Sequence, residues 1–136
     1  MAWRVAKSLL KLRDQVNQKA PHRSKSSDGT IGDAAHASRN SDHNPWVKDG
    51  HIGVVTAMDI TNDPADGCDA QALVNTLVTS RDPRIKYLIW NRRKVSSSVQ
   101  PWVWRKYTGK NPHTKHCHVS VKSDKAQYDS TSDWHI

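Results

Sequence analysis

The stretch Asn111-Pro112-His113-Thr114-Lys115-His116-Cys117-His118-Val119-Ser120-Val121 places three histidines within six residues and ends in a β-branched segment. The end of the stretch predicts a β-strand, in which successive side chains point to opposite faces. His116 and His118 therefore share one face, and Cys117 lies on the other. Two imidazoles on a rigid strand, with His113 on the entering turn, suit a divalent metal, because neutral imidazole is a common zinc ligand. For the motif taken alone, the alternative is a pair of surface histidines on an edge strand.

A carboxylate in a second apolar segment is the next candidate ligand. The segment 53–60 has the β-branched content of a buried strand, and Asp59 lies near its end. A carboxylate in such a strand is costly unless it is paired or bound to a cation. The alternative is a structural Asp that caps the following turn at 61–64.

A third ligand is expected from the long polar loop that residues 21–45 predict, since long loops in compact domains tend to be functional or disordered. A catalytic zinc takes three protein ligands and keeps one position for water. His43 is the best third ligand, because it precedes a proline-bounded turn that leads into the strand of Asp59. His51 is its main competitor. The histidines expected at the surface are His22, His36, His51 and His135.

The remaining periodicity predicts an α+β domain. Apolar residues at helical spacing predict helices at 3–19 and 70–80, the second with Asp69 as its N-cap. The segment 85–91 predicts a core strand. These elements predict a small, mostly antiparallel sheet flanked by two helices, with the metal site at the sheet.

Two aromatic residues and the C-terminal segment complete the pattern. Trp102 and Trp104 alternate, so both indoles are expected on one face of a short strand. After residue 121 the chain is polar, and residues 122–136 are expected to form a loosely held tail.

Length and charge set further limits. A chain of 136 residues predicts one domain, 1–136, with its core within about 3–121. The formal charge of +8 favours an anionic partner: nucleic acid, a membrane surface or a cell-wall polymer. Cys68 and Cys117 are too few for a disulfide framework, and free thiols are the default expectation.

Three motifs together resemble the LAS group of zinc metallopeptidases, whose pattern is SxHxxGxAxD followed by an HxH strand. Ser41-Asp42-His43 is similar to its beginning, Gly53 with Thr56-Ala57-Met58-Asp59 to its end, and His116-Cys117-His118 to the HxH. The group contains D-Ala-D-Ala carboxypeptidases and dipeptidases, the Hedgehog signalling domain, and phage and bacterial murein endopeptidases. The resemblance covers about residues 39–121. It implies that His43, Asp59 and His118 bind Zn²⁺ and that His116 lines the site.

The chain departs from this pattern at two points. His43 and Asp59 are sixteen residues apart where the pattern has seven, so residues 46–52 are expected to form an inserted turn. Many members carry a general base, Glu, three residues before the HxH, and here that residue is His113, as in the penicillin-insensitive murein endopeptidases, which also show HxxHxH. Either His113 accepts the proton itself, or His113 and His116 mainly position the reactants while zinc lowers the pKa of water.

The function that the resemblance implies is a zinc-dependent peptidase acting on the stem peptides of peptidoglycan. His113 or His116 would move the proton to the leaving amine, and Arg39 would bind a substrate carboxylate or the oxyanion. Ser41 would contact the substrate, and Trp102 and Trp104 would wall the groove, with core packing as an equal alternative for the two indoles. The scissile bond is left open among D-Ala-D-Ala, a D,D-cross-link and L-Ala-D-Glu.

A small, basic peptidoglycan peptidase without a signal peptide resembles a phage endolysin. Charges interrupt the apolar residues of the N-terminus, so we expect synthesis in the host cytoplasm and holin-type release to the wall. The expected partners are stem peptides, with transient association with an anionic wall or membrane. We expect a monomer that does not bind nucleic acid.

Two alternatives belong to other classes. Asp42-His43-Asn44-Pro45 is similar to the DHxxP-like start of HNH nucleases, in which His43 would be the general base, but Asp59 would then have no role. A non-catalytic, zinc-stabilised binding module is the other alternative. An inert site would tolerate the loss of His113 and His116, and both are present.

Overall fold

Two β-sheets meet at the segment that carries Asp59. In the computed structural model, which describes residues 2–30, 41–109 and 111–136, only Thr56 separates β3 (Ile52–Val55) from β4 (Ala57–Thr61). β3 pairs in parallel with β1 (Trp3–Val5) and antiparallel with β2 (Val47–Asp49), in the order β1-β3-β2. β4 belongs to a second sheet of five strands. The prediction of one continuous strand over 53–60 is therefore wrong: the chain changes sheets within it.

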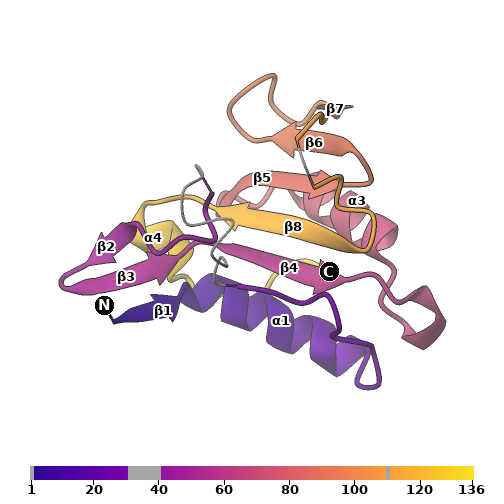
Figure 1. Ribbon diagram of the computed structural model, residues 1–136, viewed down its shortest axis with the longest axis horizontal. Coiled ribbons are helices and arrows are strands. Elements are labelled where there is room, and N and C mark those ends of the chain that lie inside the picture. The colour runs from indigo at the N-terminus through magenta and orange to yellow at the C-terminus, as the bar shows by residue number, and fades with distance from the viewer. Residues whose placement is uncertain (1, 31–40, 110) are drawn as a thin grey trace.

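The five-stranded sheet has the order β4-β8-β5-β6-β7 and is antiparallel throughout (Figure 1). It places β8 (His116–Val121) between β4 and β5 (Ile85–Trp90), and β6 (Arg93–Ser96) and β7 (Arg105–Lys106) complete it. The strands predicted after the histidine stretch and at 85–91 are confirmed. The β4–β8 pairing sets Asp59 directly opposite His118.

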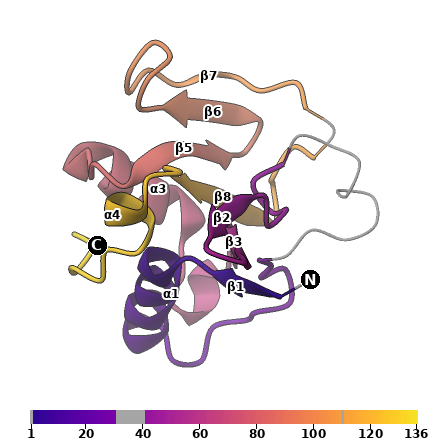
Figure 2. The same ribbon diagram turned by 90° about the vertical axis from the view of Figure 1, so that its left-hand side faces the viewer.

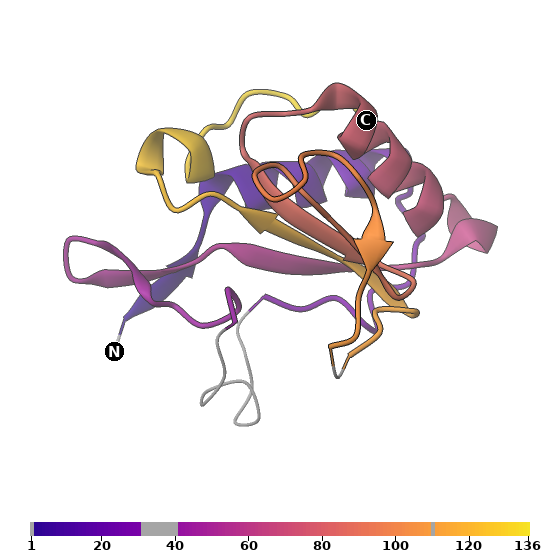
Figure 3. The same cartoon turned by 90° about the horizontal axis from the view of Figure 1, so that it is seen from above.

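The helices gather on one side of the five-stranded sheet (Figures 2 and 3). The long helices are α1 (Lys7–Lys19) and α3 (Ala70–Ser80). The predicted helix at 3–19 begins four residues late, because residues 3–5 form an edge strand beside β3. The predicted helix at 70–80 is confirmed together with its N-cap, since an Asp69 carboxylate oxygen accepts the amide proton of Ala72 at 3.2 Å.

The core lies between these helices and the sheet. The strand residues that face it are fully or almost fully buried: Met58, Ile60, Leu88, Val95, Cys117 and Val119. Alternation along β4 and β8 directs Asp59, His116 and His118 to the opposite face. Both cysteines are buried as free thiols. The α+β class with a mostly antiparallel sheet is confirmed, with two sheets where the sequence predicted one.

The C-terminal segment packs on the domain, so the prediction of a loosely held tail over 122–136 is wrong. It forms the short helix α4 (Lys125–Tyr128), and the side chain of Trp134 is only 2% exposed. The indole N–H of Trp134 donates to the carbonyl oxygen of Ser8 at 2.9 Å. The guanidinium of Arg84 lies 3.8 Å from the centre of the Trp134 ring system. The segment is polar on average, so its composition gives no sign that Trp134 is buried.

The predicted short strand at Trp102–Trp104 is also wrong. Residues 101–102 form a turn, and Trp102 has a positive φ of 64°. β7 begins after Trp104, and both indoles are half-buried against the hydrophobic core. Within the described ranges, every helix is too short or too polar to span a bilayer.

Candidate metal centre

Three side chains from separate parts of the chain converge on the sheet face that lies away from the helices. His43 comes from the loop before β2, Asp59 from β4 and His118 from β8. An Asp59 carboxylate oxygen, Oδ1, lies 3.4 Å from Nε2 of His43 and 3.2 Å from Nδ1 of His118. The three ligand atoms lie within 4.8 Å of one another and can hold a metal ion. The structure thus brings together the three ligands that the sequence predicted.

Hydrogen bonds to the far ring nitrogens orient both histidines. Nδ1 of His43 lies 2.6 Å from the carbonyl oxygen of Thr30. A carbonyl oxygen only accepts, so Nδ1 carries the proton and the Nε2 lone pair is directed at the cluster. Nε2 of His118 is hydrogen-bonded to the hydroxyl of Ser120 at 2.8 Å, which leaves Nδ1 for the cluster. Such outer bonds are typical of metal-ligating histidines.

The neighbouring chain segments fix this geometry. Gly29 forms an antiparallel bridge with Asp59 at the edge of β4, and this bridge brings the Thr30 carbonyl to His43. On the other side of His43, the Asp42 carbonyl accepts the amide proton of Thr56 at 3.3 Å. His43 is therefore held between two segments anchored to the sheets.

Atoms in the cluster are buried without ordinary partners. Oδ1 of Asp59 and Nδ1 of His118 have no hydrogen-bond partner in the part of the chain that the structure describes. These two atoms lie 3.2 Å apart, and because buried polar atoms are normally hydrogen-bonded, a cation held by both would satisfy them. Two imidazole nitrogens and one carboxylate oxygen form a donor set that suits a divalent transition metal. The residues present therefore fit a bound cation.

The directions in which the pKa values of Asp59, His118 and His43 shift agree with a bound cation. Burial raises the pKa of Asp59, but its contacts with His118 and His43 outweigh burial and hold that pKa far below its ordinary value. Burial lowers the pKa of His118 more than Asp59 raises it, which favours the neutral imidazole that a metal needs. Burial also lowers the pKa of His43, but Asp59 outweighs it and raises that pKa, so a metal competes with a proton there.

His113 and His116 lie beside the three ligands. Nε2 of His116 is 3.5 Å from the second Asp59 oxygen, and Asp59, His113 and His116 form a second set able to hold an ion. The ring of His113 stands edge-on to those of His116 and His118, with centroid distances of 5.1 and 5.3 Å. Because both sets share Asp59, the four histidines and the carboxylate form one site.

The backbone of His113 is unusual. Its φ is 54°, in the left-handed region that non-glycine residues seldom adopt. Residues held in such a conformation are often found at functional sites. The carbonyl of His113 accepts from the amide of Asn91 at 2.9 Å, and its amide donates to the side chain of Asn111 at 3.0 Å. Burial, reinforced by the charge of His118, lowers the pKa of His113 to about 4. His113 is thus a neutral imidazole held in a fixed place.

The other predicted residues have different positions. The hydroxyl of Ser41 accepts the amide proton of His43 at 3.2 Å, so it shapes the loop that carries the ligand. Arg39 lies outside the described residues, as does His36. His51 is exposed in the turn between β2 and β3 and belongs to neither set of candidate ligands among the described residues. His22 and His135 are exposed as predicted.

Sequence reasoning missed three residues at the site. Ser120 could have been found, because strand alternation puts it on the same face as His118. Thr30 and Tyr87 carried no local signal. The ring of Tyr87 stacks on that of His118, with centroids 5.3 Å apart and planes inclined by only 5°.

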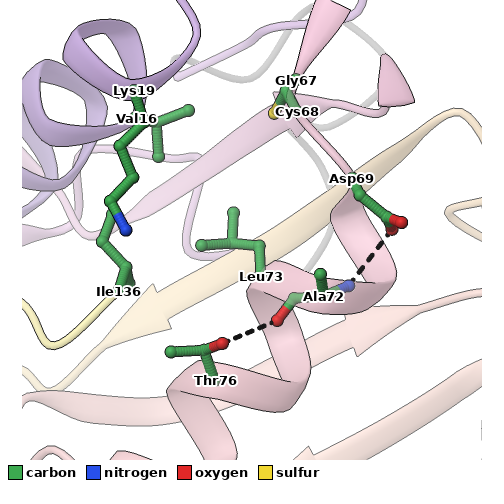
Figure 4. A pocket seen from close by; sticks show the side chains of 9 residues that line it. All are labelled: Val16, Lys19, Gly67, Cys68, Asp69, Ala72, Leu73, Thr76 and Ile136. Atoms are coloured by element: carbon green, nitrogen blue, oxygen red, sulfur yellow. Dashed lines mark hydrogen bonds between the residues drawn. The ribbon is translucent and has the colours of Figure 1, made fainter. Parts of the chain in front are cut away.

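A separate hollow of about 170 Å³ lies on the helix side of the sheet (Figure 4). Two of its polar side chains serve the fold: Asp69 caps α3, and the Thr76 hydroxyl donates to the Ala72 carbonyl in the same helix. The thiol of Cys68 donates to the Thr61 carbonyl. The candidate chemistry therefore lies on the opposite face, at the histidine cluster.

Comparison of the chain with protein-family models, curated proteins and solved structures gives no match. The assignment of a function therefore depends on the site itself.

Proposed function

We propose that this chain is a zinc-dependent peptidase that cleaves a peptide bond in the stem peptides of peptidoglycan. The observation that carries the proposal is the convergence of His43, Asp59 and His118, whose ligand atoms point at one another. Two histidines and a carboxylate form a donor set typical of catalytic zinc, which keeps a fourth position open, whereas structural zinc is closed by four protein ligands. The substrate class rests on the resemblance of the motifs, and the charge of +8 suits an anionic wall.

The residues around the ligands support hydrolysis. When bound, zinc supplies Lewis-acid chemistry, which activates water at neutral pH and polarises a carbonyl. His113 is buried, and its Nδ1 has no hydrogen-bond partner among the described residues. A fixed imidazole with a free nitrogen can accept a proton from the attacking water and pass it to the leaving amine. We assign this proton transfer to His113.

His116 has a different assignment. It contacts the second oxygen of Asp59 and stands edge-on to His113. It can therefore orient the carboxylate and donate a hydrogen bond to the developing oxyanion.

We further propose that the chain acts at the wall as an endolysin, after holin-type release.

The test is digestion of purified peptidoglycan followed by mass spectrometry of the muropeptides. Wild type is compared with His118→Ala, with a chelated sample, and with His51→Ala as an exposed-histidine control. We expect wild type and His51→Ala to cleave the stem peptides. His118→Ala and the chelated sample should not cleave them, and added zinc should restore cleavage to the chelated sample. The fragment masses identify the scissile bond. Intact peptidoglycan after treatment with protein that holds one equivalent of zinc would reject the peptidase, and DNA nicking would then test the nuclease alternative.

The roles of the two remaining histidines are separated by kinetics. His113→Ala is expected to lower kcat by about 10²–10⁴-fold with an unchanged zinc content, as the loss of a general acid–base does. If His116→Ala lowered kcat by this amount and His113→Ala did not, proton transfer would be assigned to His116.

A further inference from the structure

A cavity of about 310 Å³ lies on the same face of the five-stranded sheet as the histidine cluster. Tyr87, whose ring stacks on His118, forms part of its wall and so joins the two. The indole of Trp46 and three cationic side chains, Lys86, Lys94 and Arg105, also line it. We call this cavity the cationic subsite.

The pairing register aligns the cations with the candidate metal ligands. Asp59 lies opposite His118, His118 opposite Ile89, Ile89 opposite Lys94, and Lys94 opposite Arg105. Residues directly opposite each other in antiparallel strands project from the same face. Strands are about 4.8 Å apart, so the Lys94 backbone lies about 10 Å, and that of Arg105 about 14 Å, from His118. One row of side chains therefore runs from the metal centre into the cationic subsite.

The charges of the cationic subsite are not balanced within it. Among the residues that the structure describes, Asp42 is the single carboxylate that lines it, and it is bound to Lys86 at 3.0 and 3.2 Å. In the described ranges, neither Lys94 nor Arg105 has a carboxylate partner, and the buried Nε of Arg105 has no hydrogen-bond partner at all. Lys94 is half-buried, and its ammonium lies 4.1 Å from the centre of the Tyr87 ring.

The electrostatic cost supports the need for an anion. Burial lowers the pKa of Lys94, and the nearby charges of Arg105 and Lys86 lower it further. Like charges gathered in a partly buried site repel one another and lose solvation. A carboxylate between Lys94 and Arg105 would relieve this cost and would satisfy the unpaired guanidinium nitrogen.

We propose that the cationic subsite binds a free carboxylate of the substrate peptide through Lys94 and Arg105, and so determines which peptide bond lies at the metal centre. The inference rests on the proposed peptidase function. An extended peptide advances about 3.3–3.6 Å per residue, so a gap of about 10–14 Å corresponds to about three or four residues. Stem peptides carry free carboxylates on the γ-linked Glu, on the diamino acid and at the C-terminus, and each is a candidate for this position.

The experiment uses the zinc-loaded chain and four synthetic stem pentapeptides: the parent peptide and three versions, each amidated at one of these carboxylates. Binding is measured by calorimetry, and kcat and KM are measured for cleavage. Lys94→Met and Arg105→Gln are compared with wild type, and Lys25→Met, at an exposed lysine outside the cationic subsite, is the matched charge control. Circular dichroism verifies the fold of each variant.

We expect Lys94→Met and Arg105→Gln each to weaken binding of the parent peptide about tenfold or more and to raise KM, with kcat nearly unchanged. One of the amidated peptides should bind wild type about tenfold or more weakly than the parent peptide does. The variants should bind that peptide about as weakly as wild type does, because amidation and the substitution remove the same interaction. That peptide identifies the bound carboxylate. Lys25→Met should bind like wild type.

The outcomes separate the two proposals. If the four peptides bind wild type equally, or if Lys94→Met and Lys25→Met weaken binding alike, the cationic subsite does not bind a carboxylate. Cleavage with an unchanged KM in the variants rejects the cationic subsite and keeps the peptidase. Binding that depends on Lys94 and Arg105 without cleavage keeps the cationic subsite and rejects the peptidase. Peptides that neither bind nor are cleaved reject both.

Discussion

Zinc is expected to raise the melting temperature of the wild-type chain but to have little effect on that of His118→Ala. A ligand that binds the folded state stabilises it, and His118 supplies one of the three ligand atoms. The replacement leaves His43 and Asp59 in place but removes Nδ1 from the cluster. The effect is measured within each variant, with and without zinc, so any change in the stability of the metal-free protein cancels.

The expected shift follows from linkage. At a free zinc concentration one hundred times the dissociation constant, binding stabilises the folded state by about 2.7 kcal/mol. The unfolding entropy is about 2.1 cal/mol/K per residue, or about 0.29 kcal/mol/K for 136 residues, so the melting temperature rises by about 9 °C. If His118→Ala binds zinc a hundredfold more weakly, the same concentration gives about 0.4 kcal/mol and a rise of only about 1–2 °C.

The assay is calorimetric melting, after titration of wild type has given its zinc affinity. His51→Ala, at an exposed histidine outside the cluster, is the control and should show the full shift. A full shift in His118→Ala would mean that the ion binds elsewhere, and no shift in wild type at saturating zinc would mean that the cluster holds no zinc. Either result would refute the reasoning from geometry.

Three further predictions concern stability. Trp134→Ala should lower the free energy of unfolding in urea by about 3–5 kcal/mol, because it removes a buried indole that is hydrogen-bonded to the body of the domain. Asp28→Asn should lower it by about 1–3 kcal/mol at pH 7, because the carboxylate accepts two bonds from Arg23 at 3.0 and 2.7 Å. Burial raises the pKa of Asp28, but the contact with Arg23 outweighs burial and lowers that pKa. The stabilisation by the Asp28 carboxylate is therefore present above about pH 4 and is lost as the pH falls through the folded-state pKa. The difference in unfolding free energy between Asp28→Asn and wild type should shrink at pH 3. Gly53→Ala should destabilise by about 1–3 kcal/mol and weaken zinc binding, because its Cβ would lie 2.5 Å from the Pro45 carbonyl oxygen in the segment that follows His43.

Each of these has a contrary result. A loss below about 1 kcal/mol in Trp134→Ala would mean that the C-terminal segment contributes little to the fold. An equal effect of Asp28→Asn at pH 7 and pH 3 would show that its charge is not the cause. Full stability and zinc affinity in Gly53→Ala would show that the loop moves away at no cost.

Several elements were determined by the sequence alone. Alternation placed His116 and His118 on one face of a strand, and the helical spacing with Asp69 predicted α3 to the residue. The side chain of Asp59 was singled out because a carboxylate is costly in an apolar strand. These features depend on near neighbours in the chain, whose geometry repeats every 2 or 3.6 residues.

Other features were decided only by the tertiary structure. The sequence gives no sign that the segment 53–60 changes sheets at Thr56, or that the polar segment 122–136 is anchored by Trp134. The row from Asp59 to Arg105 exists because β4, β8, β5, β6 and β7 pair in one register. Strand pairing is selected by burial of apolar faces far apart in the sequence, and no local pattern records it. The sequence by itself therefore identified the chemical groups of the site, and the tertiary structure decided which of them meet.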